Sequence, residues 1–281
     1  MNKIKAIFSD FDGSLLNENK LIGEKDLETI KKLKQNGIHF IGATGRHFPI
    51  ARKYSKDIGT ELPFILCNGG LIYDYAREEP IKYKYIDKAL VRQLVKFAEE
   101  NNLNCYAYTS KGVYIRGDNP DKAFYERVKN IEHTVRAGEL IEAKVSDFTL
   151  EDKDVLKFLY SNCPQEKYDE LMKTDIGKSG LVEIAYSGEN FLDVNMKGAN
   201  KGVALEYTCQ MLNINPMETI AMGDNFNDIE MLKVAGIAVC PQNAKDDVKK
   251  YADVVTVSCN ENPLTRAIET INEKYGKIVL I

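Results

Sequence analysis

Two short acidic segments carry side chains that could do chemistry. Asp10 and Asp12 lie two positions apart, and the hydroxyl of Ser14 follows them. Much later in the chain, Asp224 and Asp228 lie four positions apart. Carboxylate oxygens with room for water are typical ligands of Mg²⁺, whose octahedral shell a phosphate group can complete. Together, the two segments predict a site for a metal ion and a phosphate.

Each acidic segment alone has an ordinary structural explanation. Two aspartates separated by one residue are expected by chance in a chain of this length, and they could form a solvated turn. A calcium-binding EF-hand loop is excluded, because it needs a glycine and a glutamate where Leu15 and Leu21 stand. Asp228 could cap the helix that follows it, support the site or bind the metal directly. The sequence leaves these roles of Asp228 open.

Short apolar runs precede the acidic segments, and more of them occur between predicted helices. Such runs, rich in β-branched residues and ended by turn residues, indicate strands, whereas apolar residues at a spacing of three to four indicate helices. Alternating strands and helices are typical of a doubly wound parallel sheet, which binds ligands at the carboxyl ends of its strands. The predicted strands are 4–8, 38–41, 64–67, 219–222, 237–239 and 254–257, and the predicted helices are 24–36, 88–101, 201–212 and 228–234.

Other polar side chains at this edge of the sheet would suit a phosphate. Thr44 and Arg46 follow one strand, and Lys201 begins a helix. Phosphoryl oxygens are stabilised by hydrogen-bond donors and positive charge from several directions. Each of these residues alone could be a turn residue or a surface charge, and Lys197 is better interpreted as a solvated loop lysine. Their occurrence together favours a phosphate site.

The middle of the chain has a different pattern. Hairpins predicted over 104–116 and 181–195 imply antiparallel strands. An antiparallel module between two parts of a parallel α/β domain suggests a cap over the edge where the strands end. We therefore predict a discontinuous Rossmann-like core of residues 1–82 and 197–281 and an inserted α+β cap of residues 83–196.

Composition excludes several classes of protein. The 281 residues include 38 Lys+Arg and 42 Asp+Glu, so the formal net charge of 38 − 42 = −4 disfavours nucleic acid as a partner. No apolar run is long enough to span a membrane, and the charged start lacks the pattern of a signal peptide. The six cysteines include no C-x-x-C pair. We expect a cytoplasmic protein with reduced thiols and no membrane partner.

Five motifs resemble those of the haloacid dehalogenase superfamily, and more narrowly its Cof-type branch (subclass IIB) of small-molecule phosphatases. The resemblance implies a Rossmann-like core with a C2B-type cap; the middle of the chain matches that cap only in size and placement. Ser14 departs from the branch, which usually has threonine there, but the hydroxyl is kept. The motifs are Asp10-Phe11-Asp12-Gly13-Ser14-Leu15-Leu16, Ala43-Thr44-Gly45-Arg46, Cys67-Asn68-Gly69-Gly70, Asn200-Lys201-Gly202-Val203-Ala204-Leu205 and Gly223-Asp224-Asn225-Phe226-Asn227-Asp228-Ile229-Glu230-Met231-Leu232.

The resemblance also implies catalytic roles. Asp10 would be the nucleophile that forms an aspartyl-phosphate. Asp12 would give a proton to the leaving alcohol and then take one from the attacking water. Thr44 and Lys201 would bind phosphoryl oxygens, and of the two nearby lysines Lys201 fits the family motif better than Lys197.

The resemblance further implies a metal ion and a set of substrate contacts. Mg²⁺ would be bound by the Asp10 carboxylate, the Asp12 main-chain carbonyl and Asp224, with Asp228 nearby. The residues implied to bind the substrate are Ser14, Arg46, Asn68, Gly69 and Asn227.

The implied function is Mg²⁺-dependent hydrolysis of a small phosphorylated metabolite, such as a sugar phosphate, pyridoxal phosphate or flavin mononucleotide. Two alternatives remain open: a phosphomutase of the same superfamily, and a phosphate-sensing binding protein without turnover. Asp12 favours the hydrolase, because a binding module needs no second carboxylate to activate water.

Overall fold

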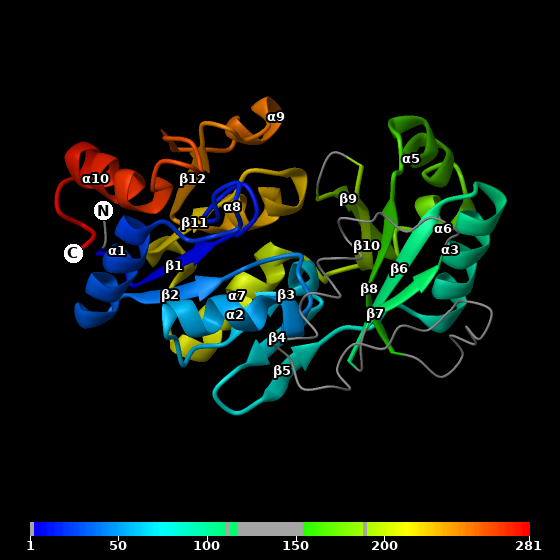
Figure 1. Cartoon of the computed structure of the whole chain (residues 1–281), viewed down its shortest axis with the longest axis horizontal. Coiled ribbons are helices and arrows are strands. Elements are labelled where there is room, and N and C mark those ends of the chain that lie inside the picture. The colour runs from blue at the N-terminus through cyan, green and yellow to red at the C-terminus, as the bar shows by residue number, and fades with distance from the viewer. Residues whose placement is uncertain (1–2, 111–112, 117–153, 188–189) are drawn as a thin grey trace.

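Two units lie side by side in the structure, a computed structural model that describes residues 3–110, 113–116, 154–187 and 190–281 (Figure 1). The first unit is built on a parallel sheet and carries both ends of the chain. The second unit is built on an antiparallel sheet and is inserted between the two parts of the first. The boundaries between the two units, after residues 82 and 196, stay a prediction.

The core sheet places the ends of its central strands at one edge. Its five parallel strands follow the order β13-β12-β11-β1-β2. β1 (Ala6–Ser9) lies between β11 (Thr219–Met222) and β2 (His39–Gly42), and all four of its residues are buried. A short strand that is apolar and covered on both faces is typical of parallel sheets. The residues that follow these three strands therefore lie close together, as predicted.

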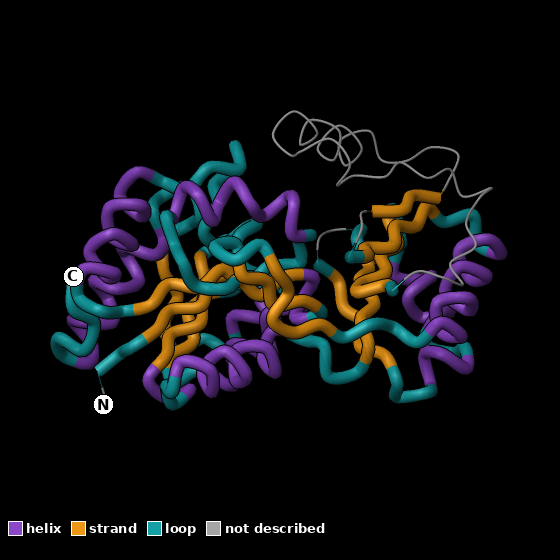
Figure 2. Tube along the Cα trace, turned by 90° about the horizontal axis from the view of Figure 1, so that it is seen from below, coloured by secondary structure: helices purple, strands orange, loops and turns teal. Residues whose placement is uncertain are grey.

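Helices cover both faces of the core sheet (Figure 2). Successive side chains of β1 point to opposite faces, so Ile7 packs with Ile30 and Leu264 on one side, while Phe8 packs with Leu205 and Met231 on the other. The helices of the core unit are α1 (Glu24–Gln35), α2 (Phe48–Ile58), α7 (Lys201–Leu212), α8 (Ile229–Val234), α9 (Asp246–Lys249) and α10 (Pro263–Tyr275). The other two strands of its parallel sheet are β12 (Ile237–Pro241) and β13 (Val254–Thr256).

A buried carboxyl joins two of these helices. Asp26 of α1 is fully buried, and its Oδ1 accepts hydrogen bonds from the amide (2.9 Å) and the hydroxyl (2.7 Å) of Thr265 in α10. Its Oδ2 has no hydrogen-bond partner in the described part of the chain. Burial raises the pKa of Asp26 above its ordinary value, and the Thr265 hydrogen bonds only partly oppose this.

We expect Asp26→Asn to change how stability depends on pH. A raised pKa in the folded state means that the native protein binds the proton more tightly than the unfolded chain does, so the wild type loses stability as the pH rises above 3.8. The free energy of unfolding of the variant, relative to the wild type, should therefore increase from about pH 4 to about pH 8 in urea titrations. Glu28→Gln, at an exposed position of the same helix, should show no such trend. A flat difference for Asp26→Asn would contradict the raised pKa.

The predicted strand over 64–67 has different partners from those expected. β3 (Phe64–Leu66) belongs to a three-stranded antiparallel sheet with β4 (Leu71–Asp74) and β5 (Glu79–Tyr83). Among the described residues, it meets the core sheet through one parallel bridge, from Ala43 to Ile65. β3 pairs in this way because the chain reverses direction in the turn after it, so that β4 lies antiparallel beside β3.

The inserted unit is an antiparallel sheet with helices on one face. Its strands follow the order β7-β6-β8-β10-β9, and both predicted hairpins are antiparallel pairs. Phe158 and Val194 pack under the helices with Leu94, whereas Tyr108 and Leu156 on the other face share a cluster with the core unit. Residues 111–112 and 188–189, in the hairpin turns, lie outside the described residues. The elements are β6 (Asn104–Thr109), β7 (Val113–Arg116), β8 (Val155–Ser161), β9 (Val182–Tyr186), β10 (Leu192–Met196), α3 (Lys88–Glu100), α5 (Gln165–Leu171) and α6 (Asp175–Lys178).

No helix in the described ranges combines the length and the apolar character that crossing a membrane requires.

Candidate active site

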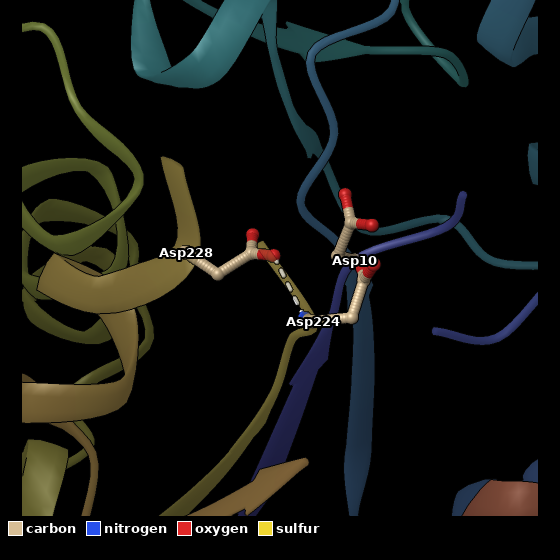
Figure 3. Close-up of side chains that lie close together, drawn as sticks. All are labelled: Asp10, Asp224 and Asp228. Atoms are coloured by element: carbon tan, nitrogen blue, oxygen red, sulfur yellow. Dashed lines mark hydrogen bonds between the residues drawn. The ribbon is translucent and has the colours of Figure 1, made fainter. Parts of the chain in front are cut away.

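The ends of β1 and β11 bring three aspartates together (Figure 3). Asp10 follows β1, Asp224 lies two residues after β11, and Asp228 ends the short 3₁₀ helix Phe226–Asp228. The parallel pairing of β1 with β11 aligns the last residues of the two strands, and so brings the segments that follow them together. One carboxylate oxygen from each aspartate lies within 4.8 Å of the other two.

Two glycines make room for this cluster. Gly13 has a positive φ of 82°, and a Cβ atom there would overlap the Asp224 carboxylate. A Cβ atom at Gly223 would overlap the side chain of Asp228. Glycine is therefore required at both positions by space, and at Gly13 also by the backbone conformation.

We expect Gly13→Ala to weaken metal binding at this cluster by at least about tenfold, because the new methyl group displaces Asp224. Titration calorimetry with Mg²⁺ would measure the loss. Gly37→Ala is the matched control, because Gly37 also has a positive φ (75°) but has nothing within 4 Å of the added Cβ. It should lower stability by about 1 kcal/mol and leave metal affinity unchanged. Equal metal affinities in the two variants would contradict the crowding at Gly13.

The charges at the cluster do not balance. Lys201, fully buried at the start of α7, donates to Asp10 Oδ1 (2.6 Å) and to Asp228 Oδ1 (2.5 Å). Three carboxylates and one ammonium group sum to −3 + 1 = −2. Burial, with the negative charge of Asp228 nearby, raises the pKa of Asp10 to about 7, and burial beside Asp10 raises the pKa of Asp224 well above its ordinary value. The raised pKa values reflect a lack of positive charge around these carboxyl groups, and a site of oxygen donors that needs positive charge fits a divalent cation.

Asp228 has partners for both of its oxygens. Oδ2 accepts hydrogen bonds from the amides of Asp224 (3.0 Å) and Asn225 (3.1 Å), and Oδ1 accepts from Lys201. Asn225 in turn begins the 3₁₀ helix, so the two residues form a reciprocal capping box. Asp228 therefore orients the loop after β11 and the Lys201 side chain, whether or not it also contacts a metal.

The Asp12 carboxylate does not belong to the three-aspartate cluster and is bound by two cations. Arg46 donates from Nε (2.6 Å) and Nη2 (2.7 Å) to the two oxygens of Asp12, and Lys20 Nζ lies 2.9 Å from Oδ1. Burial opposes the charged form of Asp12, but the attraction of Arg46 outweighs it and holds the pKa of Asp12 well below its ordinary value. The carboxylate is therefore ionised, and Arg46 contacts Asp12 in this arrangement.

The other predicted phosphate and substrate residues lie in the loops around the cluster. Ser14 donates to Asp224 Oδ1 (3.0 Å). The buried Thr44 hydroxyl accepts from the Arg46 amide (3.2 Å). The Asn68 and Asn227 side chains contact each other, with Asn227 Nδ2 donating to Asn68 Oδ1 (3.0 Å).

Gly69 and Lys197 have neighbours other than the three aspartates. Gly69 packs against the main chain of Asn200, where a Cβ atom would collide with the carbonyl. Lys197 is 65% exposed and lies 3.7 Å from Glu183. Of the two lysines considered from the sequence, Lys201 is the one beside Asp10.

Comparison with protein families identifies the kind of enzyme in which this aspartate cluster occurs. The family model described as haloacid dehalogenase-like hydrolase matches residues 7–268 of the chain. The protein is a haloacid dehalogenase-like hydrolase.

Relatives of this hydrolase act on small phosphorylated compounds. It is 27% identical over 265 residues to the 5-amino-6-(5-phospho-D-ribitylamino)uracil phosphatase of Bacillus subtilis, with 94% of each chain covered. It is 24% identical over 267 residues to the pyridoxal phosphate phosphatase of Escherichia coli, covering 89% of this chain and 92% of that one. The structure of a subclass IIB sugar phosphatase matches with a TM-score of 0.81 and 26% identity, covering 95% of this chain and 99% of that one.

These findings define the branch and the reaction class. The hydrolase belongs to the Cof-type, subclass IIB phosphatases of small molecules, enzymes that hydrolyse phosphoric monoesters. Its parallel core with an inserted antiparallel α+β cap agrees with the predicted fold. The inserted antiparallel unit is the cap of this hydrolase.

Sequence reasoning missed several polar residues near the site of this hydrolase. Lys157 and Asp193 are buried in cap strands, and His47 is buried at the start of α2, where its Nε2 lies 2.6 Å from the carbonyl oxygen of Thr109 in the cap. Burial lowers the pKa of His47 to about 4, so its ring is neutral near neutral pH. The sequence held a signal for Lys157 and Asp193, because a charged residue within an apolar strand needs a partner when it is buried.

Proposed function

We propose that the protein is a Mg²⁺-dependent phosphatase that hydrolyses a small phosphate monoester through an aspartyl-phosphate on Asp10. The arrangement around Asp10 carries this proposal. Asp10 lies at the end of the central strand, with one oxygen bound by Lys201 and with Asp224 close by. A carboxylate held in this way has one oxygen left for attack on phosphorus and a defined orientation.

In the proposed first step, an oxygen of Asp10 attacks the phosphorus atom and the bond to the leaving oxygen breaks. In the second step, water attacks the same phosphorus atom, loses a proton to Asp12, and releases phosphate from the restored Asp10 carboxylate. Arg46 and Lys20 hold Asp12 ionised, which is the form required of the base. To donate a proton to the leaving oxygen in the first step, Asp12 must first be released from Arg46 and take up that proton from the solvent.

Asp10, the main-chain carbonyl of Asp12 and Asp224 would hold the Mg²⁺ ion. When bound, the ion would neutralise the charge that keeps an anionic nucleophile away from an anionic phosphate. Lys201 and Thr44 would contact phosphoryl oxygens, and Lys201 also keeps Asp10 and Asp228 from repelling each other. Arg46, Asn68 and Asn227 would lie toward the leaving group.

The proposed substrates are small phosphorylated metabolites, such as a sugar phosphate, pyridoxal phosphate or a flavin-type phosphate. The relatives named for such substrates support this class. Profiling a panel of phosphorylated metabolites would identify the preferred leaving group.

The test is phosphate release from para-nitrophenyl phosphate with Mg²⁺, after EDTA, and after Mg²⁺ is restored. We expect release that stops with EDTA and returns with Mg²⁺. No release with any divalent metal would instead favour a phosphate-sensing binding protein. A requirement for a sugar bisphosphate primer, with the phosphoryl group transferred to the sugar and no free phosphate released, would favour a phosphomutase.

A further inference from the structure

A buried ion pair lies where the cap meets the core. Lys157 of β8 and Asp193 of β10 are joined by a contact of 2.8 Å between Nζ and Oδ2, and their side chains are 4% and 1% exposed. The Lys157 ammonium also lies 4.9 Å from the centre of the Tyr108 ring. Both residues are contributed by strands of the cap sheet.

Both residues of the pair reach across to core loops. Lys157 Nζ donates to the carbonyl oxygen of Gly45 (3.0 Å), between Thr44 and Arg46. Asp193 Oδ2 accepts from Asn68 Nδ2 (2.6 Å). The pair therefore contacts the two loops that follow β2 and β3, which carry three of the proposed site residues.

Stability alone is a poor explanation for this pair. Removing two charges from water costs several kcal/mol for each ion, and apolar residues of similar size often replace a buried pair without loss of stability. Asp193 Oδ1 is, in addition, buried without a hydrogen-bond partner among the described residues. The buried pair of Lys157 and Asp193 is better explained by its effect on the orientation of the side chains that it contacts.

The orientation imposed is that of the Asn68 amide. A side-chain amide has a donor end and an acceptor end. Asp193 can only accept, and its contact of 2.6 Å with Nδ2 of Asn68 is much shorter than the 3.4 Å contact of that atom with Asn195 Oδ1. Asp193 therefore holds Nδ2 toward the cap, and Oδ1 of Asn68 faces Asn227, whose Nδ2 donates to it (3.0 Å). Asn227 immediately precedes Asp228, which binds Lys201. Polar contacts thus join the cap to Asn227, and the next residue in the chain, Asp228, binds the lysine beside Asp10.

We propose that Lys157 and Asp193 are positioning residues. Lys157 balances the charge of Asp193, and Asp193 fixes the orientation of Asn68, and through it that of Asn227, when the cap is seated on the core. The proposal rests on the proposed function, in which Asn68 and Asn227 lie toward the substrate. Neither Lys157 nor Asp193 needs to touch the substrate.

The test compares two variants in a Lys157→Met background, so that no unpaired charge is buried. Lys157→Met with Asp193→Asn keeps an oxygen that accepts from Asn68, whereas Lys157→Met with Asp193→Leu removes it at nearly the same volume. With para-nitrophenyl phosphate, kcat/KM should be at least about tenfold lower for the leucine variant, which corresponds to about 1.4 kcal/mol. Thermal unfolding of both variants identifies any loss due to instability. Equal kcat/KM values would overturn the proposal.

A cycle with Asn68→Ala separates positioning from a general structural effect. If Asp193 acts through Asn68, the difference between the leucine and asparagine variants should disappear once Asn68 is alanine. A difference of the same size in the Asn68→Ala background would overturn the proposal.

A measurement without turnover distinguishes this proposal from the proposed function. Side-chain amide signals of ¹⁵N-labelled asparagine can be assigned by their loss in Asn68→Ala. The Asn68 signal should keep its position with Asp193→Asn and move with Asp193→Leu. If the wild type releases no phosphate, the proposed function fails, and this spectrum still decides the role of Asp193: an unmoved Asn68 signal in the leucine variant would overturn it.

Discussion

Asp12→Asn should trap the phosphoryl group on Asp10. With para-nitrophenyl phosphate, we expect one rapid equivalent of nitrophenolate for each protein molecule, followed by steady-state turnover at least about 100-fold slower than in the wild type. The aryl leaving group departs without a proton, so the first step survives. The second step is slowed because no carboxylate takes the proton from the attacking water. Rapid quenching in acid and intact-mass measurement would detect the phosphorylated protein.

Asp10→Asn is the matched control for this experiment. It makes the same chemical change two residues away, but it removes the proposed nucleophile. It should show neither the rapid phase nor the added mass. Phosphorylated protein in the Asp10→Asn variant would place the nucleophile elsewhere, and wild-type turnover in Asp12→Asn would exclude the acid–base role of that residue. Metal affinity, measured in parallel, should stay near that of the wild type in Asp12→Asn, because the proposed metal contact of that residue is its main-chain carbonyl.

Local patterns predicted the core well. The strand expected over 219–222 and the helix expected over 201–212 coincide with β11 and α7. Both are short periodic segments with turn or capping residues at their ends, and burial on both faces leaves few alternatives for such strands. The sequence therefore indicated which polar residues would gather at one edge of the sheet.

The pairing of β3 could not be predicted in the same way. Its antiparallel partner β4 follows a turn in which Cys67, Asn68 and Gly69 have φ values of 50°, 58° and 97°. Residues other than glycine adopt positive φ seldom, and no local signal at Cys67 predicts it. The structure holds this turn through tertiary contacts, including a hydrogen bond from Asn195 Nδ2 in the cap to the carbonyl oxygen of Cys67 (2.9 Å).

Pairs of distant charges also lay beyond sequence reasoning. The types and spacing of Asp10, Asp224 and Asp228 were enough to predict an acidic cluster. That Arg46 would bind Asp12, or that Lys157 would bind Asp193, depends on how loops and strands far apart in the sequence pack. A charged residue in an apolar strand indicates that a partner exists, but it does not identify the partner.

Lys201→Met should lower kcat by at least about 100-fold and also destabilise the protein. Removing one member of a buried charge network leaves the others uncompensated, which costs about 3–5 kcal/mol. Here Asp10, Asp224 and Asp228 would be left with a formal charge of −3 in a buried site. The loss in the free energy of unfolding should therefore be larger in EDTA than in saturating Mg²⁺, since a cation bound by the folded state offsets part of that charge.

Lys197→Met provides the comparison that makes this result specific. Lys197 is four residues earlier and 65% exposed, and its ammonium lies 3.7 Å from Glu183 instead of at the aspartate cluster. Exposed pairs contribute about 1 kcal/mol or less, so this variant should keep kcat within about twofold and unfold with the same Mg²⁺ dependence as the wild type. Urea titrations with and without Mg²⁺, together with nitrophenolate release, measure both effects. If the loss of stability in Lys201→Met were the same in EDTA and in Mg²⁺, the lysine and the metal would not share these carboxylates. In that case the cation that balances Asp10 and Asp224 would have to bind outside the cluster.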